Sequence, residues 1–277
     1  MPLDVGRLNR PHPFFVFLLV LTVVLSGLVG CAPLSGVTAA SGAGDLVTDS
    51  DEPASRKRAR IRLELASGYF ELGQTTVALD ELKQSIAIDP NYSDAHHLKG
   101  LVYMRLGEPK LAELSLKRAL DISQKDANVM QTLGWLLCQE SKFEESELYF
   151  LKVLASAKYD QRAKTLRTLG MCRVKSGRLV EGSDSLQASY ALDPKNSVTV
   201  FNLASSLFQK SKFVGAQKYI RELNNSDSAN PESFWLGIKV ERQMNNAEGV
   251  TQLATQLFKR FPEAKEINNY QRGAFDE

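Results

Sequence analysis

A self-similar pattern recurs along the chain about every 34 residues from Lys57 onward. Each copy pairs two stretches whose apolar residues recur three and four positions apart, which is the spacing of an amphipathic helix. One position in each copy is small: Ala66, Gly100, Gly134, Gly170, Ala204 and Gly237. The steps between them are 34, 34, 36, 34 and 33 residues, so two extra residues fall between the third and fourth copies. A period of this length predicts a stack of repeats rather than a single closed core.

The residue types that recur have mechanical explanations. A small residue in the first helix lets the second helix of the pair approach closely, and a large apolar residue of the second helix fills the space between them. These large residues are Leu82, Leu116, Phe150, Leu186 and Ile220. Glycine at 73, 107 and 177 suits a turn that needs a positive φ, and Ser141 and Ser211 stand there in two copies. Each copy is therefore expected to form a helix-turn-helix.

The helix-turn-helix period and its small residues resemble the tetratricopeptide repeat. The resemblance implies an all-α, right-handed superhelical solenoid of about six repeats, with a concave face made by the first helices. We place the repeats near 59–92, 93–126, 127–160, 163–196, 197–229 and 230–262, within a solenoid at 57–262. Residues 263–277 are assigned to a C-terminal tail.

The N-terminus has the pattern of an export signal. Arg7 and Arg10 precede an apolar run from Phe14 to Leu25 that is too short for an ordinary membrane span. Residues 28–31 (LVGC) follow this run and resemble the lipobox of bacterial lipoproteins. That resemblance implies cleavage after residue 30 and a diacylglycerol anchor on Cys31. The alternative is an ordinary secretory leader. Residues 31–56, small and polar, are predicted to be a flexible linker.

The sequence predicts neither an enzyme nor a cofactor. It has no nucleotide-binding loop and no nucleophile–histidine pair. Its three histidines, of which only His96 and His97 are adjacent, do not form a metal-ligand cluster, because zinc needs three or four convergent ligands. The near-balanced charge, 34 basic against 32 acidic residues, disfavours nucleic acid as a partner. Cys138 and Cys172 could form a disulfide in an exported protein. We favour two separate core residues, because a disulfide requires closely matched geometry.

The repeat register predicts which residues face the concave groove. We expect it to hold exposed aromatic and methionine side chains beside polar ones, a typical surface for an extended or helical peptide. The candidate residues are Phe70, Met104, Arg105, Gln131, Trp135, Arg167, Met171, Phe201, Phe208 and Phe234. The alternative is that the apolar members pack only against neighbouring first helices. A basic group that includes Lys164 and Arg167 is interpreted as a solvated face.

Leader, linker and repeats together resemble the PilW/PilF pilotin family of type IV pilus biogenesis lipoproteins. The likeness includes residues 128–138 (NVMQTLGWLLC), 142–145 (KFEE) and 260–262 (RFP), although Leu133 stands where relatives often carry tyrosine. It implies a non-enzymatic adaptor, lipid-anchored to the outer membrane and facing the periplasm, that binds the pilus secretin and promotes its localisation and multimerisation. Ala32 after the lipidated cysteine is consistent with that address. The alternative is a lipid-anchored scaffold for other envelope proteins, such as cell-wall enzymes.

Overall fold

The structure, a computed structural model, describes residues 52–156 and 159–275. Within these ranges the chain forms thirteen helices and no strand, so the all-α prediction is confirmed. The helices are α2 (Ala54–Glu71), α3 (Thr75–Ile88), α4 (Ser93–Arg105), α5 (Pro109–Ile122), α6 (Ala127–Gln139), α7 (Phe143–Ala155), α8 (Arg162–Lys175), α9 (Leu179–Leu192), α10 (Ser197–Gln209), α11 (Phe213–Asn224), α12 (Pro231–Gln243), α13 (Ala247–Arg260) and α14 (Lys265–Arg272).

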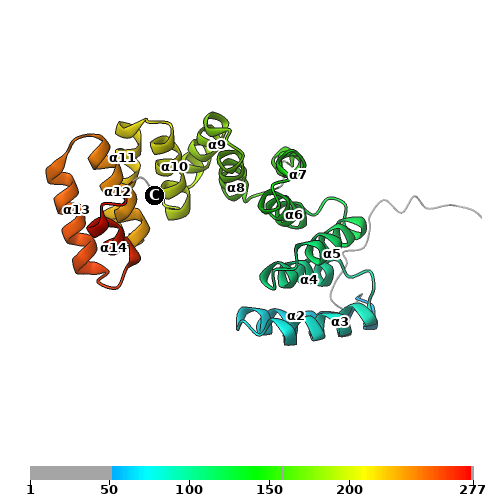
Figure 1. The fold of residues 1–277 in the computed structure, drawn as a ribbon. Helices are drawn as coiled ribbons and strands as arrows, with labels where there is room; N and C mark the ends of the chain where they lie inside the picture. Colours follow the sequence, from blue (N-terminus) through cyan, green and yellow to red (C-terminus); the bar gives the residue numbers. More distant parts are fainter. Residues whose placement is uncertain (1–51, 157–158, 276–277) are drawn as a thin grey trace, which may run out of the picture. The chain divides into compact units, whose positions relative to one another are not determined.

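The helices pack in consecutive pairs, from α2 with α3 to α12 with α13, and each pair packs on the next (Figure 1). The first helix of each pair, an even-numbered helix from α2 to α12, also contacts the first helix of the following pair. One face of the stack is therefore built from first helices alone. This arrangement brings side chains about 34 residues apart in the sequence to neighbouring places on that face.

The small residues sit where two helices of a pair approach most closely. A Cβ atom on Gly100 would lie 2.6 Å from Cγ of Leu116, and one on Gly170 would lie 2.8 Å from Cγ of Leu186. Both leucines are fully buried. Non-bonded carbon atoms pack at about 3.5–4.0 Å, so any side chain at these glycines would push the pair apart. The reason inferred from the sequence for small residues is confirmed.

The turn inside each of the six helix pairs contains one residue in the left-handed region of φ. Glycine supplies it at Gly73, Gly107 and Gly177, with φ between 73° and 86°. Ser141 and Ser211 adopt φ of 60° and 55° at the same place, as the register of the repeats predicts. Asn245, with φ of 56°, supplies the last one. Serine and asparagine tolerate this conformation at some cost, because their Cβ atoms crowd the backbone there.

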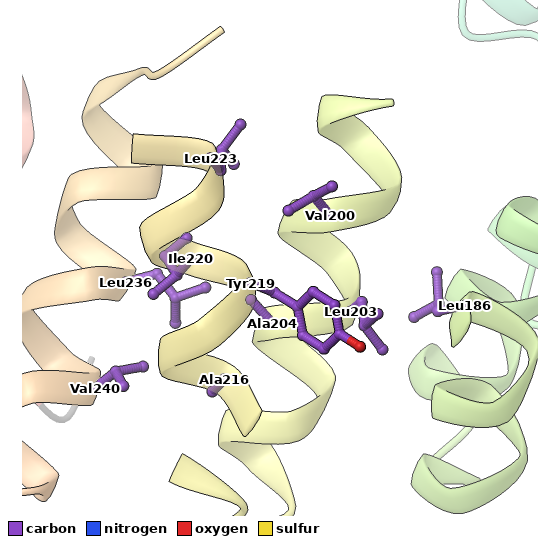
Figure 2. Close-up of a cluster of buried hydrophobic side chains, with 10 residues drawn as sticks. All are labelled: Leu186, Val200, Leu203, Ala204, Ala216, Tyr219, Ile220, Leu223, Leu236 and Val240. Atoms are coloured by element: carbon purple, nitrogen blue, oxygen red, sulfur yellow. The ribbon is translucent and has the colours of Figure 1, made fainter. Parts of the chain in front are cut away.

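The core follows the stack as a series of clusters between adjacent helices. Figure 2 shows one of them, centred on α10 and α11. Leu203 and Ala204 of α10 meet Ala216 and Ile220 of α11, and the exposed fraction of each is 1% or less. Leu186 of α9 joins from the preceding repeat, and Leu236 and Val240 join from α12. Burying one such leucine or isoleucine stabilises the fold by about 1.5–3 kcal/mol.

Cys138 of α6 and Cys172 of α8 form a disulfide, with their Cα atoms 5.9 Å apart. The expectation of two separate core cysteines is therefore wrong. Gly134 and Gly170 mark equivalent positions 36 residues apart, whereas the cysteines are 34 apart. The cysteines thus occupy different registers of two adjacent first helices. Close contact of these helices, which the sequence spacing alone does not reveal, brings the two sulfur atoms together.

The two ends of the described region differ from the sequence assignment. Helix α2 begins at Ala54, inside the segment assigned to the linker, and the ion pair of Arg56 with Asp89 holds its first turn. Helix α14 lies inside the segment assigned to the tail. The leader at 1–30, Cys31 and most of the linker lie outside the described residues. Among the helices that the structure describes, none is long and apolar enough to cross a membrane.

Candidate partner-binding groove

A hollow of about 580 Å³ opens on the face made by first helices and spans α4, α6, α8 and α10. We call it the groove. It is lined by Asp94, His97, Leu101, Met104, Asp126, Asn128, Gln131, Thr132, Trp135, Lys164, Arg167, Thr168, Met171 and Val198.

The lining follows one register in each repeat, counted from the small residue of the first helix. The position six residues before it holds Asp94, Asn128, Lys164 and Val198 in successive repeats. The position three before it holds His97, Gln131 and Arg167, and the position after it holds Leu101, Trp135 and Met171. Steps of three and four residues keep these side chains on one face of each helix. Equivalent positions therefore form three rows across the groove.

The row that follows the small residue is apolar. Trp135 is half-buried and packs against the cluster that contains the disulfide, Phe150 and Leu169. Leu101 and Met171 continue the row on α4 and α8, and Met104 lies one turn further along α4. A tryptophan held in place from behind offers a large, ordered apolar surface to a ligand. Methionine beside it can adapt its shape to different ligand side chains.

His97 lies between the acidic and the basic part of the groove. Its Nε2 is 2.9 Å from Oγ1 of Thr132, whose hydroxyl donates to the Asn128 carbonyl. The threonine oxygen therefore accepts from a protonated Nε2 of the neutral ring. Burial lowers the pKa of His97, and Lys164 adds to that lowering, whereas the carboxylates of Asp126 and Asp94 oppose it. The ring is thus favoured as a neutral hydrogen-bond donor.

The acidic residues Asp94 and Asp126 stand at the N-terminal ends of α4 and α6. Asp126 caps α6, because its carboxylate accepts hydrogen bonds from the backbone N–H groups of Asn128 and Val129. Asp94 lies in the first turn of α4 and is exposed. Asp94 has no ion pair with any residue that the structure describes. Both carboxylates border the groove, and Asp94 is available to a ligand.

The basic residues Lys164 and Arg167 face the groove from α8. Lys164 Nζ has a long contact of 3.4 Å with the amide oxygen of Gln161. The half-buried Arg167 guanidinium makes neither a hydrogen bond nor an ion pair within residues 52–156 and 159–275. A guanidinium offers five donors in a fixed planar arrangement that matches a carboxylate. Both residues line the groove, as the prediction for Arg167 expected, so they are more than a solvated face.

Five of the ten residues assigned to the groove by sequence line it: Met104, Gln131, Trp135, Arg167 and Met171. Gln131 has a structural role as well. It is buried, and its amide oxygen accepts from the hydroxyl groups of Tyr159, at 2.8 Å, and Thr165, at 2.5 Å. These bonds join α6 to α8 and to the segment that precedes it, so this oxygen is not free for a ligand.

The other five residues assigned to the groove lie outside its lining. Arg105 stacks on the Phe70 ring, with Cζ 3.6 Å from the ring centroid, and donates to the Phe70 carbonyl. Phe201 and Phe208 are partly buried against the core cluster of α10 and α11. Phe234 is fully buried and packs with Ile267 of α14, so its assignment to an exposed groove was wrong. A closing helix that was not foreseen covers its position.

The same register could have identified the lining residues that were missed. Asp94, Asn128 and Val198 share the position of Lys164, and His97 shares that of Arg167. Most of the residues predicted from the sequence were large apolar side chains, so the smaller or polar residues at equivalent positions were missed. Among the residues that the structure describes, no group of three or more His, Cys, Asp or Glu side chains could hold a metal ion.

Comparisons with known proteins agree with this architecture. Residues 67–107 match a family model described as a TPR repeat, and residues 93–126 match one described as a tetratricopeptide repeat. The chain is 24% identical over 238 residues to the type IV pilus assembly protein PilF of Pseudomonas aeruginosa, an alignment that covers 86% of this chain and 93% of that relative.

Two solved structures share the fold over most of the described chain. A crystal structure of PilW, a type IV pilus biogenesis factor, superposes with a TM-score of 0.74 at 23% identity and covers 78% of this chain and 99% of that one. The structure of Pseudomonas aeruginosa PilF gives a TM-score of 0.68 at 24% identity and covers 79% and 99%. The chain is therefore a tetratricopeptide repeat protein homologous to PilF and PilW, and its solenoid is the superhelical fold expected.

Proposed function

We propose that this protein is a type IV pilus biogenesis factor that acts as a pilotin. It binds the secretin subunit, brings it to the outer membrane and promotes its multimerisation into the channel through which the pilus leaves. It does so by binding rather than by catalysis. The partner is a protein segment rather than a nucleic acid or a small molecule. The observation that supports this most is a groove of apolar, acidic and basic side chains on a solenoid that aligns with nearly all of PilF.

The N-terminal sequence supports an anchored form of this function. A leader at 1–30 followed by Cys31 would attach the solenoid to the outer membrane, on its periplasmic side, through acyl chains. Each buried methylene contributes about 0.8 kcal/mol to membrane binding, so several chains on one cysteine hold firmly. A linker of about 25 residues has a mean reach of roughly 25–30 Å. The groove would therefore work close to the membrane to which the secretin must be delivered.

The test separates the anchor from the groove. In the first strain, Cys31→Ser behind a cleavable secretory leader removes the lipid. We expect secretin to co-purify with this variant but to assemble away from the outer membrane. In the second strain, Leu101→Gln with Trp135→Ala removes apolar contacts of the groove. We expect this variant to reach the outer membrane and to lose secretin, measured by pull-down and by the amount of heat-resistant secretin multimer.

A matched control replaces two exposed apolar residues outside the groove, Val180→Ala and Val214→Ala. This control should assemble secretin normally. Thermal unfolding of every variant checks that the solenoid is intact. Normal secretin multimers in both test strains would refute the proposal. Recovery of cell-wall enzymes in place of secretin would favour the alternative of an envelope scaffold.

A further inference from the structure

The charge of the groove changes sign along the stack at equivalent positions. Six residues before the small residue, the repeats hold Asp94 on α4, Asn128 on α6 and Lys164 on α8. Three residues before it, they hold His97, Gln131 and Arg167. Asp126 adds a second carboxylate beside α6. The charged part of the groove thus has an acidic end on α4 and at the start of α6 and a basic end on α8, with Trp135 on α6 between them and the apolar Val198 of α10 beyond the basic end.

These charges are separated on the scale of a short peptide. Packed helices lie about 8–10 Å apart, and an extended chain advances about 3.3 Å per residue. A peptide that crosses the first helices therefore advances by roughly three residues for each repeat. Side chains that face Asp94 on α4 and Arg167 on α8 would be roughly six residues apart, with one side chain over Trp135 near the midpoint.

We propose that the groove selects an extended peptide segment of mixed charge. A cationic side chain of the segment faces Asp94 and Asp126, a large apolar side chain packs on Trp135, and an anionic side chain faces Lys164 and Arg167. The proposal deepens the peptide-binding role proposed above and rests on it. It identifies the class of segment by the order of its charges, which neither the fold nor the apolar row of the groove specifies.

Charge complementarity argues for this occupant over a segment of one charge. A uniformly basic segment would meet the guanidinium of Arg167, and a uniformly acidic one would meet the carboxylate of Asp94. Opposite charges at a binding surface select the partner and its register, and like charges placed together exclude wrong partners. A mixed segment is the class that satisfies both ends of the groove at once.

The proposal is tested by the affinity of the full chain, in detergent, for three fluorescent twelve-residue peptides. All three carry a central leucine. The mixed peptide has two lysines on one side of it and two glutamates on the other, and the two uniform peptides have four lysines or four glutamates. Exposed charge pairs are individually weak, so two satisfied ends should make the mixed peptide about five- to tenfold tighter than either uniform peptide at low salt. The difference should shrink at about 0.5 M salt.

Reversing the basic end makes the test specific to the groove. Lys164→Glu with Arg167→Glu leaves both ends acidic, and we expect the four-lysine peptide to become the tightest. Glutamate in the first turn of α8 suits the helix dipole, and Arg167 holds no other residue in the described chain, so the fold should persist. The control is Lys110→Glu with Lys125→Glu, an equal change of charge outside the groove lining. It should keep the wild-type order of peptides.

The outcomes separate this inference from the pilotin function. The charge selection is overturned if the three peptides bind with equal affinity. It is also overturned if Lys164→Glu with Arg167→Glu leaves the order of the peptide affinities unchanged. If secretin multimers still depend on Leu101 and Trp135 in that case, the proposed function stands without it. If the order of affinities switches as expected and secretin assembly is normal in every groove variant, the groove selects a mixed-charge segment that is not part of the secretin. Binding of the mixed peptide that survives Trp135→Ala unchanged also overturns the inference.

Discussion

At the scale of a residue, His97 links the groove to the stability of the fold. Its ring is partly buried and its pKa is lowered, mainly by that burial, while Asp126 and Asp94 act in the opposite direction and Lys164 in the same one. Below the unperturbed pKa of 6.5, the unfolded chain takes up a proton at His97 that the folded chain does not. Stability should therefore fall as the pH drops below about 6.5, by at most about 1.4 kcal/mol per pH unit from this group.

The variant His97→Gln should remove this contribution, because glutamine can still donate to Thr132 but does not titrate. We expect the free energy of unfolding, from urea titrations at pH 7.5 and pH 5.5, to differ less between the two pH values than in the wild type. His96, whose pKa burial also lowers, keeps its own share of the dependence. Thr132→Ser serves as the control, since it retains the hydroxyl and so the pH dependence. An unchanged pH dependence in His97→Gln would contradict the prediction, because it would mean that the pKa of His97 is the same in the folded and the unfolded chain.

Individual residues show what the sequence could predict and what it could not. Gly100 and Leu116 were predictable, because a small residue opposite a large one is a local rule repeated in each pair. Gln131 and Phe234 were also placed at the correct position of the repeat, but they were expected to be exposed and both are buried. Their burial depends on Tyr159 and Thr165 for Gln131, and on α14 for Phe234. Packing partners outside the repeat pattern carry no periodic signal.

At the scale of the elements, the disulfide fastens α6 to α8 where the connection is two residues longer than elsewhere. Cross-linking positions 34 residues apart removes conformational entropy from the unfolded chain, worth about 3–4 kcal/mol. We expect Cys138→Ala with Cys172→Ala to lower the free energy of unfolding by about this amount in urea titrations. Because α6 and α8 border the groove, the variant should also bind the mixed-charge peptide more weakly.

A reducing agent provides the control for this prediction. It should destabilise the wild type to about the level of the double variant and leave the double variant unchanged. Equal stability of wild type and variant under oxidising conditions would mean that the cross-link adds nothing to the packing of α6 on α8. The helix pairs themselves were predictable from apolar spacing and turn residues. The cross-link was not, because two buried cysteines in a helical repeat are as compatible with simple packing as with a bond.

At the scale of the whole molecule, a stack of repeats has two ends that its regular pairs do not cover. Each pair contacts its neighbours, so the last pair would expose the surface that a seventh would bury. Helix α14 covers it with Ile267, which packs in one cluster with Phe234 and Leu257. Phe275 then stacks on Trp235 at 5.3 Å between ring centroids, and the Arg242 guanidinium lies 4.0 Å from the Phe275 ring centroid. The C-terminal segment therefore acts as the cap of the described solenoid.

Deletion of residues 265–277 should expose Phe234 and Trp235 and cost about 3–5 kcal/mol at that end of the stack. Because each repeat contacts only its neighbours, the loss of stability should be confined to that end of the stack. Hydrogen exchange should speed up in α12 and α13 and stay at the wild-type rate in α4 to α8. Affinity for the mixed-charge peptide should persist, because the groove ends at α10, while size-exclusion chromatography should show self-association through the uncovered aromatic surface.

The milder variant Phe275→Ala should show the same pattern at smaller amplitude. Faster exchange throughout α4 to α8, or loss of peptide binding, would instead mean that the cap stabilises the whole stack as one cooperative unit.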